Sequence, residues 1–328
     1  MEGTSSRTKR LIWLITAGSP SRFLETRGVY VALVLAILIS ALLSPAFYKF
    51  SNILNVLRAA AVLGVVSVGQ TLVILGGGID LSVGAVMGTV AIAVSEITGG
   101  KDDSVAVAIV ACLAIGAVVG LLNGLLITKR NIPPFVATLG MLIFVEGARF
   151  AWTKGIISGR PAPFVRVLAS IIGFIPIPVV IVVVLAVVVG LLLKKAPFGR
   201  QLYATGGNRE VARFSGIDVE RISIVTYVLC GFSAAIAGLI LSGYIGYGDR
   251  YLGRGFDLDS IGAVVVGGTS FAGGRGGIGG TLAGVLLLTA MFNIVLILNL
   301  QVHYQIIVKG AVIIGAVLLY SMQTRSEG

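Results

Sequence analysis

The sequence is poor in charged residues, cysteine and histidine. Only 12% of its 328 residues are Asp, Glu, Lys or Arg, whereas 56% are hydrophobic. Ordinary soluble domains carry roughly 25% charged residues, so this composition disfavours a water-soluble globular domain. Two cysteines and one histidine provide no disulfide framework and no cluster of metal ligands. We therefore expect no metal site in this chain.

Motifs for nucleotide hydrolysis and for other enzyme chemistry are also lacking. A phosphate-binding loop of the Walker type needs a lysine followed by serine or threonine, and no lysine in the sequence has that neighbour. The patterns HExxH and GxSxG are absent as well. We expect that the chain is not an enzyme and binds no cofactor, in particular no ATP.

Long apolar runs fill most of the chain instead. About 20 helical residues span a bilayer core, and ten runs approach or exceed that length. The predicted spans are residues 29–47, 56–75, 81–98, 104–127, 135–152, 177–193, 222–243, 258–273, 278–298 and 304–320. The eighth starts beside Asp259 and contains several glycines, so a re-entrant or broken helix competes with a full crossing. The fold class is thus an all-α membrane protein with about ten transmembrane helices.

The basic residues indicate the orientation of these spans. The net charge is +11, but the lysines and arginines flank apolar runs and do not form a nucleic-acid-binding patch. Roughly twice as many of them fall on the side that holds both termini, which by the positive-inside rule is the cytoplasm. We predict a cytoplasmic tail (1–28), a transmembrane domain (29–321) with a cytoplasmic loop (194–221), and a second tail (322–328).

Glycine is abundant, at 45 residues, and much of it recurs every fourth residue. Small residues at this spacing share one helix face and let transmembrane backbones approach closely. We therefore expect close helix packing at three sets of positions. These are Gly84 and Gly88; Gly116, Gly120 and Gly124; and Gly276, Gly280 and Gly284.

Two denser glycine-rich runs, GGGIDLSVG (76–84) and GGTSFAGGRGGIGG (267–280), stand between apolar runs, one in each half of the chain. Interrupted segments at matching positions are typical of transporters built from two repeats. We predict broken or re-entrant helices whose exposed backbone lines the route of a solute. The predicted route residues of these runs are Gly76, Gly77, Gly78, Asp80, Ser82, Gly267, Gly268 and Thr269.

Four polar residues near or within apolar runs allow a structural and a functional interpretation. Asp80 is a candidate for the solute pathway, or an N-cap of the helix that follows it. Glu146 and Arg149 are three residues apart and can pair on one helix face, or line a pore. Asn123 either bonds a neighbouring helix or meets a solute hydroxyl. All but Arg149 are counted among the candidate pathway residues.

The hydrophilic segment 194–221 predicts one short helix. Asn208 is a suitable N-cap, Glu210 follows in the first turn, and Gly216 is a terminator. Val211 and Phe214 fall on one side of this helix. A helix with an apolar side on a polar loop indicates a partner surface, and the alternative is a solvated loop helix without a partner.

These motifs resemble a known family. GGGIDLSVGAVMG, NIPPFVATLGM, FGRQLYATGGNREVARFSGIDVER and AVVVGGTSFAGGRGGIGGTLAGVL are similar, in unbroken order, to the permeases of ribose, xylose and galactose importers of the ATP-binding-cassette type. The resemblance implies a bacterial inner-membrane permease that forms a dimer and receives a monosaccharide from a periplasmic binding protein. It also implies separate cytoplasmic ATPase subunits, which bind ATP and magnesium.

The resemblance further implies that the short helix is the coupling helix, which enters a cleft on the ATPase. Its candidate residues are Gly207, Asn208, Arg209, Glu210, Val211, Ala212, Arg213, Phe214, Ser215 and Gly216. Within it we expect Val211, Ala212, Phe214 and Gly216 to make the contact. Arg209 and Arg213 are expected to meet acidic residues at its rim.

Several alternatives stay open at this point. Glu146 before Gly147 departs from the family pattern, which leaves the solute undetermined among sugars, nucleosides and a furanose-like signalling molecule. Branched-chain amino acid permeases share the superfamily, and the second permease of the dimer can be a copy or a relative. A secondary transporter or a passive channel would explain the apolar runs but would leave the capped loop helix without a role.

Overall fold

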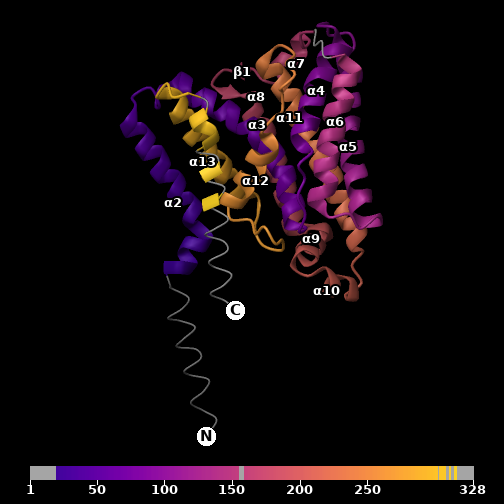
Figure 1. Ribbon diagram of the computed structural model, residues 1–328. Helices are drawn as coiled ribbons and strands as arrows, with labels where there is room; N and C mark the ends of the chain where they lie inside the picture. Colours follow the sequence, from indigo (N-terminus) through magenta and orange to yellow (C-terminus); the bar gives the residue numbers. More distant parts are fainter. Residues whose placement is uncertain (1–19, 155–158, 302, 308–309, 312–313, 316–328) are drawn as a thin grey trace.

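The computed structural model describes residues 20–154, 159–301, 303–307, 310–311 and 314–315 (Figure 1). Within these residues nearly all regular structure is helical, and one hairpin of two short strands is present. The predicted all-α class is therefore confirmed. Six helices among the described residues are long and apolar enough to cross a membrane.

The helices follow one another along the chain with few long connections. Their bounds are α2 (Pro20–Leu43), α3 (Phe50–Leu75), α4 (Val83–Thr98), α5 (Val105–Lys129), α6 (Pro134–Thr153), α7 (Pro163–Val167), α8 (Ile177–Lys195), α9 (Pro197–Gly207), α10 (Arg209–Phe214), α11 (Val219–Ile245), α12 (Phe256–Val266) and α13 (Ile278–Ile297). The strands β1 (Ile171–Ile172) and β2 (Ile175–Pro176) pair antiparallel, with Ile171 opposite Pro176.

The count of ten membrane helices is not established by this structure. The six spans are α3, α5, α6, α8, α11 and α13, and two shorter apolar helices are Gly28–Leu43 of α2 and α4. The tenth predicted run, 304–320, lies largely outside the described residues. At the start of the chain, α2 begins at Pro20 and extends into the segment predicted as a tail. The remainder of that tail and all of 322–328 lie outside the description.

The eighth predicted span is not a full helical crossing. Its helix α12 has 11 residues and ends at Val266, where Gly267 and Gly268 turn the chain. At 1.5 Å per residue, 11 residues span about 16 Å, roughly half of a hydrocarbon core. The alternative of a broken or re-entrant segment is the one that the structure favours.

Helices α3 and α4 form the interior of the bundle. Every residue of α3 from Ala60 to Leu75 is buried. The long helix α11 packs against α3, α4 and α5, while α2 and α13 cover the opposite side (Figure 1). The outward faces of α5, α6 and α8 are apolar and exposed, as expected of surfaces that face lipid.

The close contact of α5 with α11 follows from glycines at every fourth position. A Cβ at Gly116 would collide with the carbonyl oxygen of Gly231, and one at Gly120 with that of Tyr227. At Gly124 a Cβ would lie 2.8 Å from the Cα of Ile224. The predicted glycine face is therefore confirmed as a helix–helix contact.

The other two glycine sets also pack at backbone distance. Gly280 and Gly284 of α13 face Gly267 and Ala263 at the end of α12. Gly84 and Gly88 of α4 meet the backbone of a connection around Gly253 instead of a second helix. Close packing is confirmed for these four glycines, but the partner of α4 could not be inferred from spacing alone. Gly276 of the third set lies in the loop before α13, where a Cβ would collide with Thr269, and so it does not share the helix face.

The two ends of the bundle differ in character. At one end lie the hairpin and α7, and at the other lie α9 and α10, below the connection between α3 and α4 (Figure 1). The predicted loop 194–221 thus contains two helices, where the sequence predicted one.

Candidate functional site

The first glycine-rich run forms a tight turn between α3 and α4. The amide of Gly78 donates to the carbonyl of Val73 at 2.9 Å, and Gly77 has a φ of 75°. Such a left-handed conformation favours glycine. A Cβ at Gly78 would collide with the hydroxyl of Tyr227, which donates to Ile79 O at 3.2 Å. The turn is therefore held against α11 by contacts that leave no room for a side chain.

The second run forms a longer loop between α12 and α13. Gly268, Gly273 and Gly274 all have positive φ angles, of 85°, 90° and 72°. The amide of Ser270 donates to the carbonyl of Arg275 at 2.9 Å and closes the loop on itself. Gly267 packs against α13, and Thr269 is buried. These two predicted route residues therefore face their own helical hairpin.

The two runs meet at a single place, together with α9. The amide of Gly274 donates to Leu75 O at 2.9 Å, and a Cβ at Gly273 would lie 2.9 Å from the nitrogen of Gly77. Gly206 of α9 lies between them, since a Cβ there would collide with Leu75 O and approach the nitrogen of Gly274 to 2.7 Å. We call these five residues, Leu75, Gly77, Gly206, Gly273 and Gly274, the glycine junction.

A buried polar cluster lies immediately after the junction. Asp80 Oδ1 accepts from the amide of Ser82 at 2.9 Å and from its hydroxyl at 2.6 Å. Asn123 of α5 donates to Ser82 Oγ at 2.9 Å and to Asp80 Oδ1 at 3.4 Å. In the orientation that satisfies its amide, Gln70 bonds both backbone groups of Asp80 at 3.2 Å.

This cluster changes the interpretation of Asp80. Helix α4 starts at Val83 and its N-cap position is Ser82, so Asp80 is not the N-cap but stabilises the turn before it. Asp80 and Asn123 are 1% and 0% exposed, and Asn123 does bond a neighbouring element, as one of its two interpretations predicts. Within this chain both residues hold the first glycine-rich turn in place, and their contact with a solute stays a prediction.

Glu146 and Arg149 of α6 do form the predicted ion pair, at 3.8 Å. The Arg149 side chain is only 2% exposed and also donates to the carbonyls of Arg250 at 3.1 Å and Leu252 at 3.5 Å. Arg149 therefore fastens the connection between α11 and α12 to the last turns of α6. No bond joins Glu146 to the residues of the glycine junction among those described, so this pair is a separate structural element.

Replacing Arg149 by leucine is expected to destabilise the chain by about 2–3 kcal/mol, because two carbonyls would lose a charged donor in a buried place. Glu146→Gln should cost under about 1 kcal/mol, since its carboxylate is partly exposed and such pairs contribute little. Thermal unfolding in detergent measures both. Equal shifts for the two variants would contradict this assignment.

The segment between α8 and α11 is built as two capped helices. Asn208 Oδ1 accepts from the amides of Glu210 at 3.0 Å and Val211 at 3.1 Å, which confirms the predicted N-cap. Gly216, with a φ of 80°, ends α10, and the amide of Ile217 returns to Ala212 O at 3.1 Å. The predicted terminator is thus confirmed as well.

The outward face of α10 is apolar. Phe214 is 91% exposed and Val211 is 58% exposed, whereas Ala212 is buried at 3%. Ala212 therefore faces its own chain and cannot belong to a contact surface, contrary to the prediction for that residue. Gly207 and Ser215 flank the helix at its two ends. Phe214 is the most exposed large apolar side chain among the described residues.

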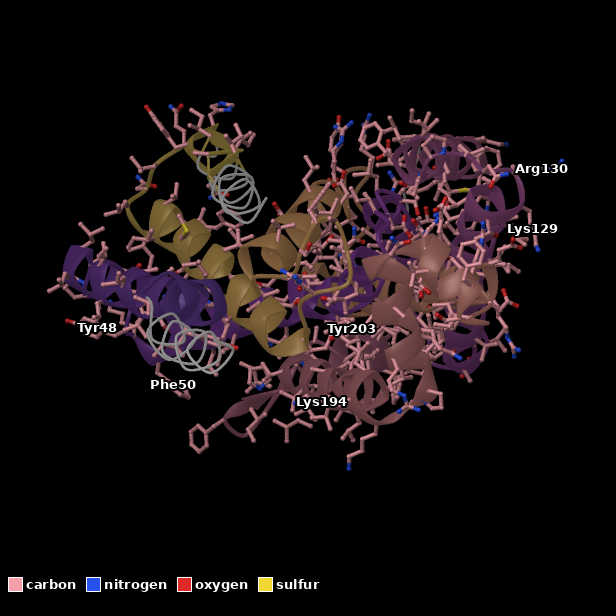
Figure 2. The ribbon with its side chains drawn as sticks, turned by 90° about the horizontal axis from the view of Figure 1, so that it is seen from below. Tyr48, Phe50, Lys129, Arg130, Lys194 and Tyr203 are labelled. Atoms are coloured by element: carbon pink, nitrogen blue, oxygen red, sulfur yellow. The ribbon has the colours of Figure 1, made fainter. Side chains whose placement is uncertain are left out.

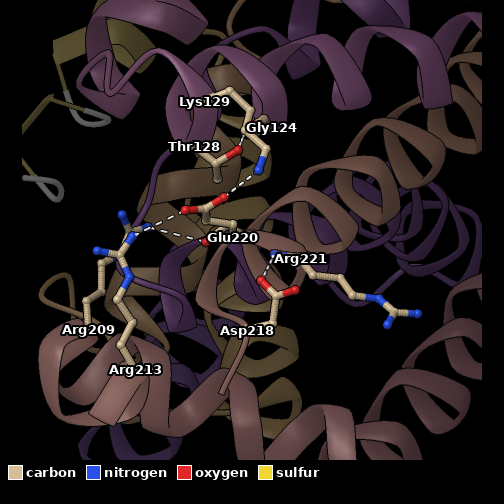
Figure 3. A network of polar contacts seen from close by, with 9 residues as sticks. Gly124, Thr128, Lys129, Arg209, Arg213, Asp218, Glu220 and Arg221 are labelled. Carbon is tan, nitrogen blue, oxygen red and sulfur yellow. Dashed lines mark hydrogen bonds and ion pairs between the residues drawn. The ribbon is translucent and has the colours of Figure 1, made fainter. Parts of the chain in front are cut away.

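A network of charges joins α10 to two membrane helices (Figure 3). Glu220 of α11 pairs with Lys129 at the end of α5 at 2.5 Å, and with Arg213 at 3.7 Å. Arg209 reaches Ser223 at 3.5 Å. Arg213, which was expected to meet the rim of a partner, thus has a partner in its own chain. The orientation of α10 relative to α5 and α11 is set by these contacts.

Sequence reasoning missed helix α9 and the glycines of the junction that it positions. Pro197 at the first position of α9 is a helix-start signal that could have indicated it. The sequence around Gly206, Gly273 and Gly274 does not indicate which residues they contact. Their importance comes from contacts between three segments that are far apart in the sequence.

The chain is similar over most of its length to several known proteins. Residues 52–318 match a family described as the permease component of the branched-chain amino acid transport system. The chain is 41% identical to a ribose import permease protein of Bacillus subtilis, over 90% of this chain and 92% of that protein. It is 38% identical to a ribose import permease protein of Escherichia coli, over 88% and 91%. It is 32% identical to a galactose/methyl galactoside import permease protein of Escherichia coli, over 92% and 95%. No solved structure was found to match the chain.

Proposed function

The chain belongs to the family of transport-system permease components, and we propose that it is the membrane subunit of an ATP-driven importer for a monosaccharide. The observation that supports this most directly is the glycine junction. It places the end of α9 against both glycine-rich loops, and α9 is followed directly by the capped helix α10. An externally driven movement of α10 then has a physical route to the loops.

The proposed solute is a neutral sugar such as ribose. Relatives with 30 to 41% identity are named as permeases for ribose, allose and galactose. Loops rich in glycine expose backbone N–H and C=O groups, which suit a polyhydroxylated solute without a fixed charge. Gly76, Gly78, Ser82 and Asn123 are the proposed contributors from the first half of the chain.

The proposed energy source is a partner chain. We propose that cytoplasmic ATPase subunits bind ATP and magnesium, and that a periplasmic binding protein delivers the solute to a dimer of permeases. The exposed apolar face of Val211 and Phe214 supports a partner at α10. A partner shifts the equilibrium between two states of the permease only by binding them differently. We therefore propose that the contact between α10 and the ATPase is rigid, which agrees with the caps at both ends of α10.

The proposed topology is a bacterial inner-membrane protein with both termini and residues 194–221 in the cytoplasm. A tenth helix and a two-repeat arrangement belong to the same proposal. The two glycine-rich loops at matching places in the two halves support a repeat. The concentration of basic residues at the α9–α10 end supports the orientation.

Reconstitution tests the proposed function. The chain should co-purify with an ATPase in mild detergent, and proteoliposomes that contain both, supplied with the binding protein, should accumulate labelled ribose or a related sugar only with hydrolysable ATP. Uptake driven by an ion gradient in the absence of nucleotide would show a secondary transporter instead. Downhill flux that needs neither would show a channel.

A further inference from the structure

A groove of about 390 Å³ opens between α8, α9 and the start of α13. Its volume falls within the roughly 300–1,000 Å³ of ligand sites. Lys194 and Tyr203, seen from the α9–α10 end in Figure 2, line it together with the first residues of α13. The groove is separate from the glycine junction, because none of the junction residues lines it.

The larger part of the groove is apolar and faces the membrane. Val183 and Val187 of α8 line it and are 50% and 54% exposed, and Leu282 of α13 lies opposite. Both helices are among the membrane spans. Anything that fills this part must therefore be apolar and must reach it from the lipid.

The end of the groove near α9 is polar and carries positive charge. Lys194, in the last turn of α8, contributes an ammonium group. Helix α13 begins there at Ile278, and its N-cap residue, Gly277, has no side chain to accept from the first amides. The first amides of a 20-residue helix and its dipole add further positive potential at this point. The hydroxyl of Tyr203 donates to Gly276 O at 2.9 Å and holds the segment just before α13 in place.

An apolar groove with a positive end matches one class of molecule in a membrane. We propose that it holds an anionic phospholipid of the cytoplasmic leaflet, with the headgroup phosphate at Lys194 and one acyl chain along Val183 and Val187. Basic pockets between membrane helices on the cytoplasmic side suit such headgroups. A soluble anion would leave the apolar part in contact with water. The proposal rests on the membrane orientation given above and not on the transported solute.

Two substitutions separate the two parts of the groove, each with a matched control. Lys194→Gln removes the charge, and its neighbour Lys195, which does not line the groove, gives the control Lys195→Gln. Gly190→Leu fills the apolar part, since no atom lies within 4 Å of a Cβ there. Gly140→Leu, on the exposed face of α6 with equally open surroundings, is its control.

The experiment measures dioleoyl phosphatidylglycerol and dioleoyl phosphatidylcholine retained by the delipidated chain in native mass spectrometry. The parent should retain phosphatidylglycerol preferentially. Lys194→Gln should lower that retention about fivefold, which corresponds to about 1 kcal/mol for one lysine at a membrane surface. Gly190→Leu should remove it, and both controls should behave as the parent.

Three outcomes of the lipid measurement would overturn the proposal. They are equal retention of the two lipids by the parent, equal losses in variants and controls, and displacement of the retained lipid by millimolar inorganic phosphate alone. A disulfide between two chains that carry Gly190→Cys would also overturn it, because a second copy would then cover the groove. Lys194→Gln keeps the test decisive if Gly190→Leu fails to fold.

Discussion

Truncating Phe214 to alanine is expected to weaken the complex with the ATPase by about 2 kcal/mol or more, about 30-fold in affinity. Its side chain is 91% exposed in the isolated chain, so a large apolar surface is free for burial against a partner. Aromatic anchors buried at an interface typically carry losses of this size. ATPase co-purification and solute-stimulated ATP hydrolysis should both fall, and sugar uptake with them.

Because Phe214 is exposed, the effect of its truncation on the partner can be separated from an effect on the fold. Phe214 contributes little to the fold, so its truncation should leave the free energy of unfolding of the purified chain within about 0.5 kcal/mol of the parent. Arg209→Ala on the same helix is the control, since a rim charge costs much less than a buried anchor. Unchanged uptake and hydrolysis in Phe214→Ala would show that α10 is not the coupling element.

Adding a methyl group at Gly206 is also expected to lower sugar uptake strongly, by overpacking the glycine junction and not by weakening the contact with the ATPase. Gly206→Ala places a Cβ against the carbonyl oxygen of Leu75, so that the backbone of α9 or of the α3 end must shift. Overpacking of this kind typically costs about 1–3 kcal/mol, and a shift of that size in a two-state equilibrium is roughly 5- to 150-fold. We therefore expect the rate of sugar uptake to decrease by roughly 5- to 150-fold.

The neighbouring residue provides a matched control. Gly207 follows directly in α9 and has no atom within 4 Å of a Cβ, so Gly207→Ala should transport like the parent. Because α10 is unchanged in Gly206→Ala, the ATPase should still co-purify and hydrolyse ATP. Loss of the ATPase together with transport would mean that the substitution acts on the fold of α9 and not on transmission through the junction.

Elements with strong local signals could be predicted from the sequence. The long apolar runs of α5, α8 and α11 indicate membrane helices because their composition alone makes any other environment unfavourable. The cap at Asn208 and the stop at Gly216 were correct because both depend on residues within one turn. Glu146 and Arg149 pair for the same reason, being three residues apart on one helix.

Features that depend on tertiary contacts could not be predicted. Nothing around Gly206 indicates that Leu75 and Gly274 will surround it. Ala212 was expected in the contact with a partner, but the sequence does not show which residues of a short helix are covered by the rest of the chain. Capping of α4 was one of the two interpretations of Asp80, but its carboxylate closes a turn with Ser82. Asn123 of a distant helix bonds both residues, which no local pattern indicates.

The glycine junction is built from contacts between main-chain atoms, and this limits which substitutions it can accept. Glycine is the smallest residue, so every substitution at Gly77, Gly206 or Gly273 adds volume, and no exchange can relieve a neighbour by removing atoms. A substitution at these positions can therefore only increase the volume of the residue. A position that carries a side chain, such as Asn123, can by contrast be exchanged for a smaller residue as well as for a larger one. Selection or engineering can therefore change the glycines of the junction only by adding atoms, whereas positions with side chains can change in both directions.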